Sequence, residues 1–136
     1  MTALTTRPLS ASTDALLRFA LRADATLTGM AGLAVAAFAN PLSTVSGLSP
    51  TTEYLIGAAF VMYGVAVYYL AALPSLRNVG IGISLANLAG TVGTLVIVMT
   101  DAAPLTEAGI AATLATGVYT AFFAYLQYLG VRRLQA

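Results

Sequence analysis

Four apolar stretches, separated by short polar segments, dominate the sequence. A helix needs about 20 apolar residues to cross the hydrocarbon core of a bilayer. The pattern predicts four such helices, at about 21–40, 52–73, 79–100 and 105–130. The first helix must begin near Leu21, because the stretch from residue 25 to residue 40 is too short to cross by itself.

Prolines mark the expected ends of these helices. Proline suits the first helical turn and is excluded from the interior, so we expect Pro50 and Pro104 to begin helices and Pro41 and Pro74 to end them. The segment 42–49 is then predicted to be a loop that turns at a glycine.

The composition supports lipid as the solvent for these stretches. Hydrophobic residues make up 59% of the 136 residues and charged residues only 8%, whereas soluble domains carry about 25% charged residues. We therefore predict an all-α membrane protein, a four-transmembrane-helix bundle formed by residues 14–134. Residues 1–13 are rich in Ser and Thr and are predicted to be a disordered cytoplasmic tail.

A cleaved signal peptide is the alternative interpretation of the first stretch. Ala37, Phe38 and Ala39 form a small-residue cleavage pattern after an apolar segment. On that interpretation the mature chain would begin at Asn40.

The arginines predict the orientation in the membrane. In the four-helix arrangement all of them fall on one side, and the acidic residues Glu53, Asp101 and Glu107 fall on the other. By the positive-inside rule, we expect both termini to face the cytoplasm. We expect the membrane to be a bacterial cytoplasmic (inner) membrane. The residues that define the topology are Arg18, Arg22, Arg77, Arg132 and Arg133, together with Arg7 in the tail.

An internal repeat suggests two duplicated helical hairpins. The segment 50–53 (PTTE) matches 104–107 (PLTE), and the same offset places Tyr68 and Tyr69 over Phe122 and Phe123. The alternative is that alanine-rich helices align with one another by chance.

Small residues recur at helical spacing in the predicted helices. Such ridges let backbones approach closely, which drives helix association in lipid. We expect packing within the bundle, or self-association through one ridge as the functional alternative. The glycines concerned are Gly29, Gly32, Gly82, Gly90, Gly109 and Gly117.

Few strongly polar residues enter the predicted helices, and they form the candidate polar site: Asp24, Tyr63, Asn87 and Gln127. Ionisable groups inside a membrane are costly and often functional. The simpler interpretation makes Asp24 a hydrated interfacial residue, paired with an arginine from a neighbouring helix end (Arg77, Arg132 or Arg133). The sharper one is a small cavity, open to the cytoplasm, lined by Asp24, Asn87 and Gln127. Tyr63 is expected to donate to a carbonyl or a threonine.

The entry into the first helix, Arg22-Ala23-Asp24-Ala25 followed by Gly29 and Gly32, resembles small uncharacterised four-helix integral membrane proteins of actinobacteria. The resemblance implies a layout and no activity. The small multidrug transporters differ, since they carry a glutamate inside the first helix.

Three function classes follow, in this order of preference. The first is a non-enzymatic accessory or scaffold subunit of a membrane complex, with other membrane protein subunits or a second copy as partner. The second is a small oligomeric transporter, channel or lipophile-binding protein that uses Asp24. An enzyme comes last, because the chain has no Cys or His. The net charge of +1 gives no indication of nucleic-acid binding, and we expect no cofactor or metal.

Overall fold

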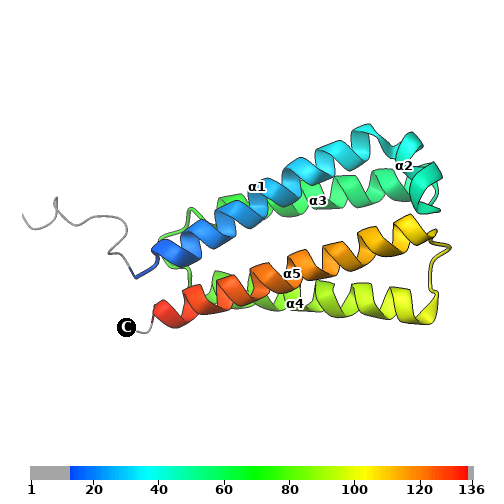
Figure 1. Cartoon of the computed structure of the whole chain (residues 1–136). Coiled ribbons are helices and arrows are strands. Elements are labelled where there is room, and N and C mark those ends of the chain that lie inside the picture. The colour runs from blue at the N-terminus through cyan, green and yellow to red at the C-terminus, as the bar shows by residue number, and fades with distance from the viewer. Residues whose placement is uncertain (1–12, 135–136) are drawn as a thin grey trace, which may run out of the picture.

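A computed structural model describes residues 13–134, and this part of the chain is entirely helical, without strands. Both described ends lie at one end of the bundle, which we call the inner end (Figure 1). The short helix α2 and the α4–α5 turn lie at the opposite, outer end. In chain order the five helices are α1 (Ala15–Ala37), α2 (Ala39–Ser46), α3 (Pro50–Leu70), α4 (Arg77–Thr100) and α5 (Glu107–Arg133). The predicted tail, residues 1–13, lies outside the described residues apart from Thr13.

Three helices, α3, α4 and α5, are long and apolar enough to cross a membrane. The first helix reaches that threshold only together with α2, and the two are bent by 91° at the break between them. The described residues therefore contain three candidate membrane spans, or four if α1 and α2 together form one. A helical membrane bundle is compatible with both counts.

The end of the first helix differs from the prediction. The helix α1 ends at Ala37, and Pro41 does not terminate it but lies in the first turn of α2. The first-turn N–H groups of a helix have no intrahelical partner, so a proline there loses no hydrogen bond. Most of the predicted loop at 42–49 is consequently helical. The helix α2 ends at Ser46 and is capped by Gly47, whose φ of 88° suits glycine.

The starts of α3 and α5 show how far the predicted repeat extends. Pro50 is the first residue of α3, which Ser49 caps by accepting a hydrogen bond from the backbone N–H of Thr52. In α5 the cap is Thr106, and the helix begins at Glu107, so Pro104 lies before the helix. The two matching segments thus take up different positions relative to their helices.

The first hairpin, α1 with α3, is packed through glycine. A Cβ atom on Gly32 would lie 2.5 Å from the carbonyl oxygen of Gly57, and one on Gly64 would lie 2.6 Å from that of Ala25. Gly29 lies opposite Gly64. The two backbones therefore touch, as small-residue interfaces in membranes allow. Gly57 and Gly64 were not among the predicted packing positions.

The second hairpin, α4 with α5, uses only part of the predicted ridge. A Cβ atom on Gly90 would lie 3.4 Å from Thr120, and Gly117 is closed off by the side chain of Thr94. Gly82 has nothing within 4 Å of its Cβ position, so it packs against no other part of the described chain. Gly109 faces the backbone of Ser46 in α2.

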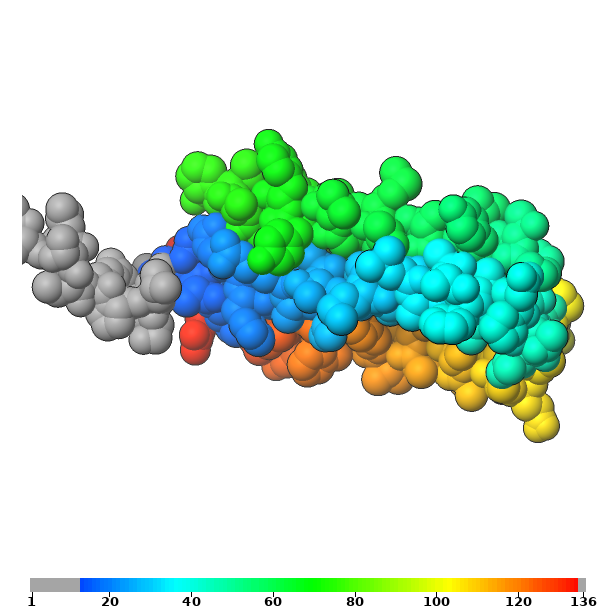
Figure 2. All heavy atoms as spheres, turned by 90° about the horizontal axis from the view of Figure 1, so that it is seen from above, coloured from blue at the N-terminus to red at the C-terminus, as the bar shows by residue number. Residues whose placement is uncertain are grey.

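The two hairpins meet mainly through α1 and α5. Figure 2 shows α1 running the length of the molecule, with α3 on one side and α5 on the other. At the inner end Leu17, fully buried, fits against Gly80 and Gly130. At the outer end the backbone N–H of Thr106 donates to the carbonyl of Ser46 at 3.0 Å.

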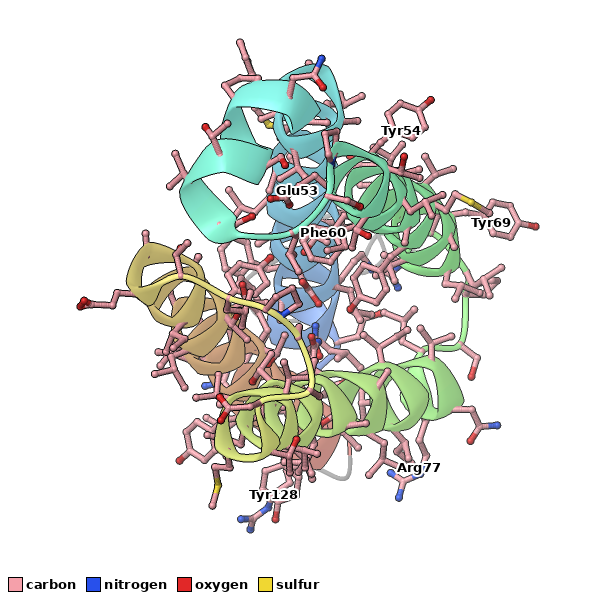
Figure 3. The ribbon with its side chains drawn as sticks, turned by 90° about the vertical axis from the view of Figure 1, so that its right-hand side faces the viewer. Glu53, Tyr54, Phe60, Tyr69, Arg77 and Tyr128 are labelled. Carbon is pink, nitrogen blue, oxygen red and sulfur yellow. The ribbon has the colours of Figure 1, made fainter. Side chains whose placement is uncertain are left out.

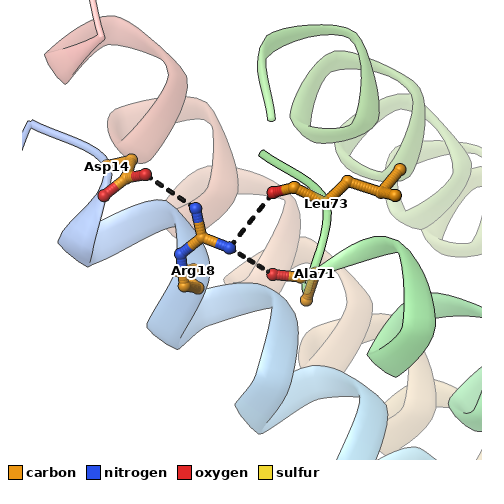
Figure 4. Close-up of polar contacts among 4 residues, drawn as sticks. All are labelled: Asp14, Arg18, Ala71 and Leu73. Carbon is orange, nitrogen blue, oxygen red and sulfur yellow. Dashed lines mark hydrogen bonds and ion pairs between the residues drawn. The ribbon is translucent and has the colours of Figure 1, made fainter. Parts of the chain in front are cut away.

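Arg18 ties α1 to the end of α3 (Figure 4). Its guanidinium donates to the carbonyl oxygens of Ala71, at 2.7 Å, and Leu73, at 3.2 Å, and pairs with Asp14 at 2.7 Å. A cation favours the exposed carbonyls at a helix C-terminus. An arginine predicted only to set topology thus also fixes the inner end of the first hairpin.

The α1–α3 contact yields a stability prediction. Gly64→Ala forces a methyl group into the backbone of α1, and overpacking of this kind costs about 1–3 kcal/mol. Gly82→Ala is the matched control, because its Cβ position is open. We expect only Gly64→Ala to lower the free energy of unfolding, measured by SDS titration in mixed micelles. Equal effects of the two substitutions would contradict this packing.

Candidate functional site

Asp24, on α1, is the centre of a buried polar cluster, with an exposed fraction of 0%. Its Oδ2 atom accepts three hydrogen bonds, each from a different helix. The donors are the Tyr63 hydroxyl at 2.7 Å, the Asn87 amide at 2.8 Å and the Gln127 amide at 2.9 Å. The Asn87 amide also donates to the Gln127 amide oxygen at 2.9 Å, so the neighbours support one another.

The other carboxylate oxygen, Oδ1, lies among hydroxyl groups. Thr28, one turn along α1, donates to it at 3.0 Å, and the Tyr119 hydroxyl donates to it at 2.9 Å. The two hydroxyls are themselves 2.8 Å apart. The Tyr119 hydroxyl also lies 3.1 Å from the backbone carbonyl of Asp24.

This cluster draws on all four long helices, α1, α3, α4 and α5. A polar group away from water is costly unless it is hydrogen-bonded. Within residues 13–134, every buried side-chain nitrogen and oxygen has a partner. The fold therefore compensates the burial of Asp24 with donors from each helix.

The structure corrects the salt-bridge interpretation of Asp24. The residue is buried rather than hydrated, and the five side chains that hydrogen-bond its carboxylate are all neutral. Arg77, Arg132 and Arg133 are exposed at the inner end. The apolar cluster around Leu17, Leu21 and Val131 occupies this end of the bundle.

The structure brings the four predicted polar residues together but does not place them around a cytoplasmic cavity. Asp24, Tyr63, Asn87 and Gln127 are mutual neighbours in one cluster. Asp24 and Gln127 are fully buried, so neither lines an open space. Tyr63 donates to the Asp24 carboxylate rather than to a carbonyl or a threonine.

A cavity of about 520 Å³ lies on the outer side of the cluster, between the two hairpins. We call it the inter-hairpin cavity. Its polar end is formed by Thr28, Tyr63, Asn87 and Tyr119, which are four of the five side chains that hydrogen-bond the Asp24 carboxylate. The rest of its lining is mostly apolar, with Thr116 and Thr120 on α5 as further hydroxyls. Figure 3 shows Phe60 directed between the hairpins, while Tyr54 and Tyr69 point outward.

The inter-hairpin cavity reaches the apolar flank of the bundle. Ala59 on α3 and Ala86 on α4 line it and are exposed, as are Leu27 and Ala115 on α1 and α5. The cavity is therefore accessible from the side of the bundle, between helices. Another hollow, of about 560 Å³, lies along Arg18, Arg22 and Tyr68 on the outside of the first hairpin and does not reach Asp24.

Two members of the cluster, Thr28 and Tyr119, were not predicted. Both could have been found from helical spacing: Thr28 follows Asp24 by four residues, and Tyr119, Phe123 and Gln127 recur at steps of four on one face of α5. The sequence does not indicate that this face of α5 packs against α1. Only the packing of the two hairpins supplies this information.

Within the described residues, no group of three or more His, Cys, Asp or Glu side chains is arranged to hold a metal ion. No known protein family, curated protein or solved structure matches the chain. The interpretation of the site therefore rests on its own geometry.

The cluster predicts unequal effects for two tyrosines of α3. Tyr63→Phe removes a hydrogen bond to a buried carboxylate, which we expect to cost about 1–2 kcal/mol. Tyr69→Phe, at a site that is 69% exposed, should change stability by less than about 0.5 kcal/mol. The measurement is the unfolding free energy of both variants in mixed micelles. A Tyr63→Phe variant as stable as the control would contradict the hydrogen-bonding scheme.

Proposed function

We propose that this protein is an integral protein of the bacterial cytoplasmic membrane that binds a small lipophilic molecule carrying one polar group. The binding site is the inter-hairpin cavity. The observation that carries the proposal is the pairing of apolar walls with a hydrogen-bonding end, since small-molecule sites are mostly apolar with a few placed polar groups.

The polar end suits a neutral head group. Tyr63 and Tyr119 use their hydroxyl hydrogens within the cluster, but each oxygen keeps acceptor capacity toward the cavity. Thr116 and Thr120 add hydroxyls on the α5 wall. A hydroxyl or amide group of a ligand could be satisfied here, while its apolar part lies against Phe60 and the alanines. The exposed alanines at the rim favour entry from the bilayer.

The placement of charge supports four spans with both termini in the cytoplasm. Arg18 and Arg22 lie within the first eight residues of α1, and Arg77 is the first residue of α4. Arg132 and Arg133 lie in the last turn of α5, so all five are toward the inner end. Positive residues favour the cytoplasmic side. In this arrangement α1 crosses the membrane and α2 lies across its outer end, so the inter-hairpin cavity lies on the outer side of Asp24.

A second function, as an accessory subunit of a membrane complex, is favoured by one surface. Gly82 and Gly93 on α4 have nothing within 4 Å of their Cβ positions, and Ala89, between them, is exposed. Small residues facing lipid offer close approach to another helix. Such a partner would be another membrane subunit or a second copy of this chain.

The orientation can be tested with single cysteines, since the chain has none. Ala102→Cys lies in the α4–α5 turn and Ser75→Cys in the α3–α4 turn, at opposite ends of the bundle. We expect a membrane-impermeant maleimide to label only Ala102→Cys in intact cells, and both after the cells are broken. Labelling of Ser75→Cys in intact cells would show that the protein has the opposite orientation.

Ligand binding can be tested with a long-chain alcohol carrying a photoactivatable diazirine, incorporated into vesicles with the protein. We expect adducts at Phe60 and Tyr119, and their loss in Ala59→Trp, because the indole fills the cavity. The matched control is Ala66→Trp, also exposed on α3 but outside the cavity lining. Adducts spread evenly over the lipid-facing surface, and unchanged by Ala59→Trp, would contradict the proposal.

A further inference from the structure

Three oxygen atoms at the polar end of the inter-hairpin cavity form a closed triangle. Asp24 Oδ1, Thr28 Oγ1 and the Tyr119 hydroxyl are separated by 3.0, 2.9 and 2.8 Å. Each of these separations is a normal hydrogen-bond length between oxygens. A hydrogen atom is therefore expected in each of the three oxygen–oxygen contacts.

The hydroxyl groups supply only two hydrogens. A threonine and a tyrosine carry one O–H hydrogen each, and an ionised carboxylate carries none. If both hydroxyls donate to Oδ1, their own 2.8 Å contact places two oxygens together without a hydrogen between them. A hydrogen on Oδ1 removes the conflict, since Asp24 can donate to Thr28, Thr28 to Tyr119, and Tyr119 to Oδ1.

We propose that Asp24 is a proton-binding site, and that it exchanges its proton with the inter-hairpin cavity through the hydroxyls of Thr28 and Tyr119. The proton sits on Oδ1. The opposite oxygen, Oδ2, is already saturated by three donors, from Tyr63, Asn87 and Gln127, and has no room for it.

The groups that face Asp24 carry no positive charge. The titratable neighbours are Tyr63 from α3 and Tyr119 from α5, while α4 contributes only the neutral Asn87. On α1 itself, Arg22 is exposed and Arg18 is engaged with Asp14 and the end of α3. A negative charge without a counter-charge in an apolar interior is expensive even when it is hydrogen-bonded, and a bound proton removes it.

Exchange needs only the hydrogens already in the triangle. The Tyr119 hydroxyl lines the cavity and touches Oδ1. It accepts a proton on the cavity side, from water or from a protonated molecule there, while passing its own hydrogen to Oδ1. The carboxylate becomes a carboxyl group, the hydroxyl keeps one hydrogen, and the source loses one proton. Release follows the same path in reverse.

This inference stands without any ligand, although it refines the proposed function: if a lipophile binds in the cavity, it binds beside a group that can take up or release a proton. The test therefore uses the ligand-free protein. If the photolabelling experiment fails and the test below succeeds, the proposal of ligand binding is wrong and the proposal of a proton-binding site stands.

Infrared spectroscopy of the protein in vesicles at neutral pH provides the test. A protonated carboxyl group shows a C=O stretching band that a carboxylate lacks. We expect this band in the wild type, its shift in D₂O because the proton exchanges, and its loss in Asp24→Asn. Glu53→Gln is the matched control: Glu53 is the other buried acid, 7% exposed, and accepts from Ser46 at the outer end. Absence of the band in the wild type, or its loss in Glu53→Gln instead, overturns the proposal.

Asp24→Asn should fold, because its amide can donate to Thr28 and Tyr119 in place of the carboxyl hydrogen while its oxygen accepts the three remaining bonds. If it does not fold, a second measurement decides. In the double variant Asp14→Asn/Asp101→Asn, Asp24 is the only aspartate that remains in the sequence. Its ¹³Cγ resonance, in aspartate-labelled protein, should have the chemical shift of a carboxyl group at neutral pH, and the shift of a carboxylate would contradict the proposal.

Discussion

The arrangement of the bundle depends on one carboxyl group placed where water does not reach. Asp24 sits on α1 at the centre of the four long helices, and each of the other three directs at least one neutral donor at it. Hydrogen bonds between membrane helices contribute modestly one at a time. Here several share a single acceptor, so moving any helix leaves a buried polar group unsatisfied, which is the larger cost.

The small residues determine where this network can form and what lies beside it. Glycines at 32, 57 and 64 bring α1 onto α3, and Gly80 and Gly130 admit Leu17 between the hairpins at the inner end. Nothing comparable joins α3 to α4 on the outer side of Asp24, and the space there remains as the inter-hairpin cavity. The polar cluster and the cavity are therefore two results of the same packing.

The sequence was sufficient to predict an all-helical, membrane-compatible chain and four members of the polar cluster, because apolar length and isolated polar residues are local signals. It was insufficient for the environment of Asp24. Its neutral donors come from helices distant in sequence, and helical spacing says which residues share a face but not which faces meet. The bend at Phe38 was not predicted, for a related reason. A proline is compatible both with the end of one helix and with the first turn of the next. The position of the break, before Pro41, shows that the second case applies here.

The central claim, that Asp24 holds the two hairpins together, is tested most directly by the distance between α3 and α4 near the outer end. Spin labels at Leu55→Cys and Val96→Cys, both exposed positions, report this distance by pulsed electron resonance in vesicles. We expect a single narrow distance distribution in the chain that carries only the two labels, and a broader or longer one when Asp24→Leu is added. Identical distributions would show that the hairpins are held by other contacts.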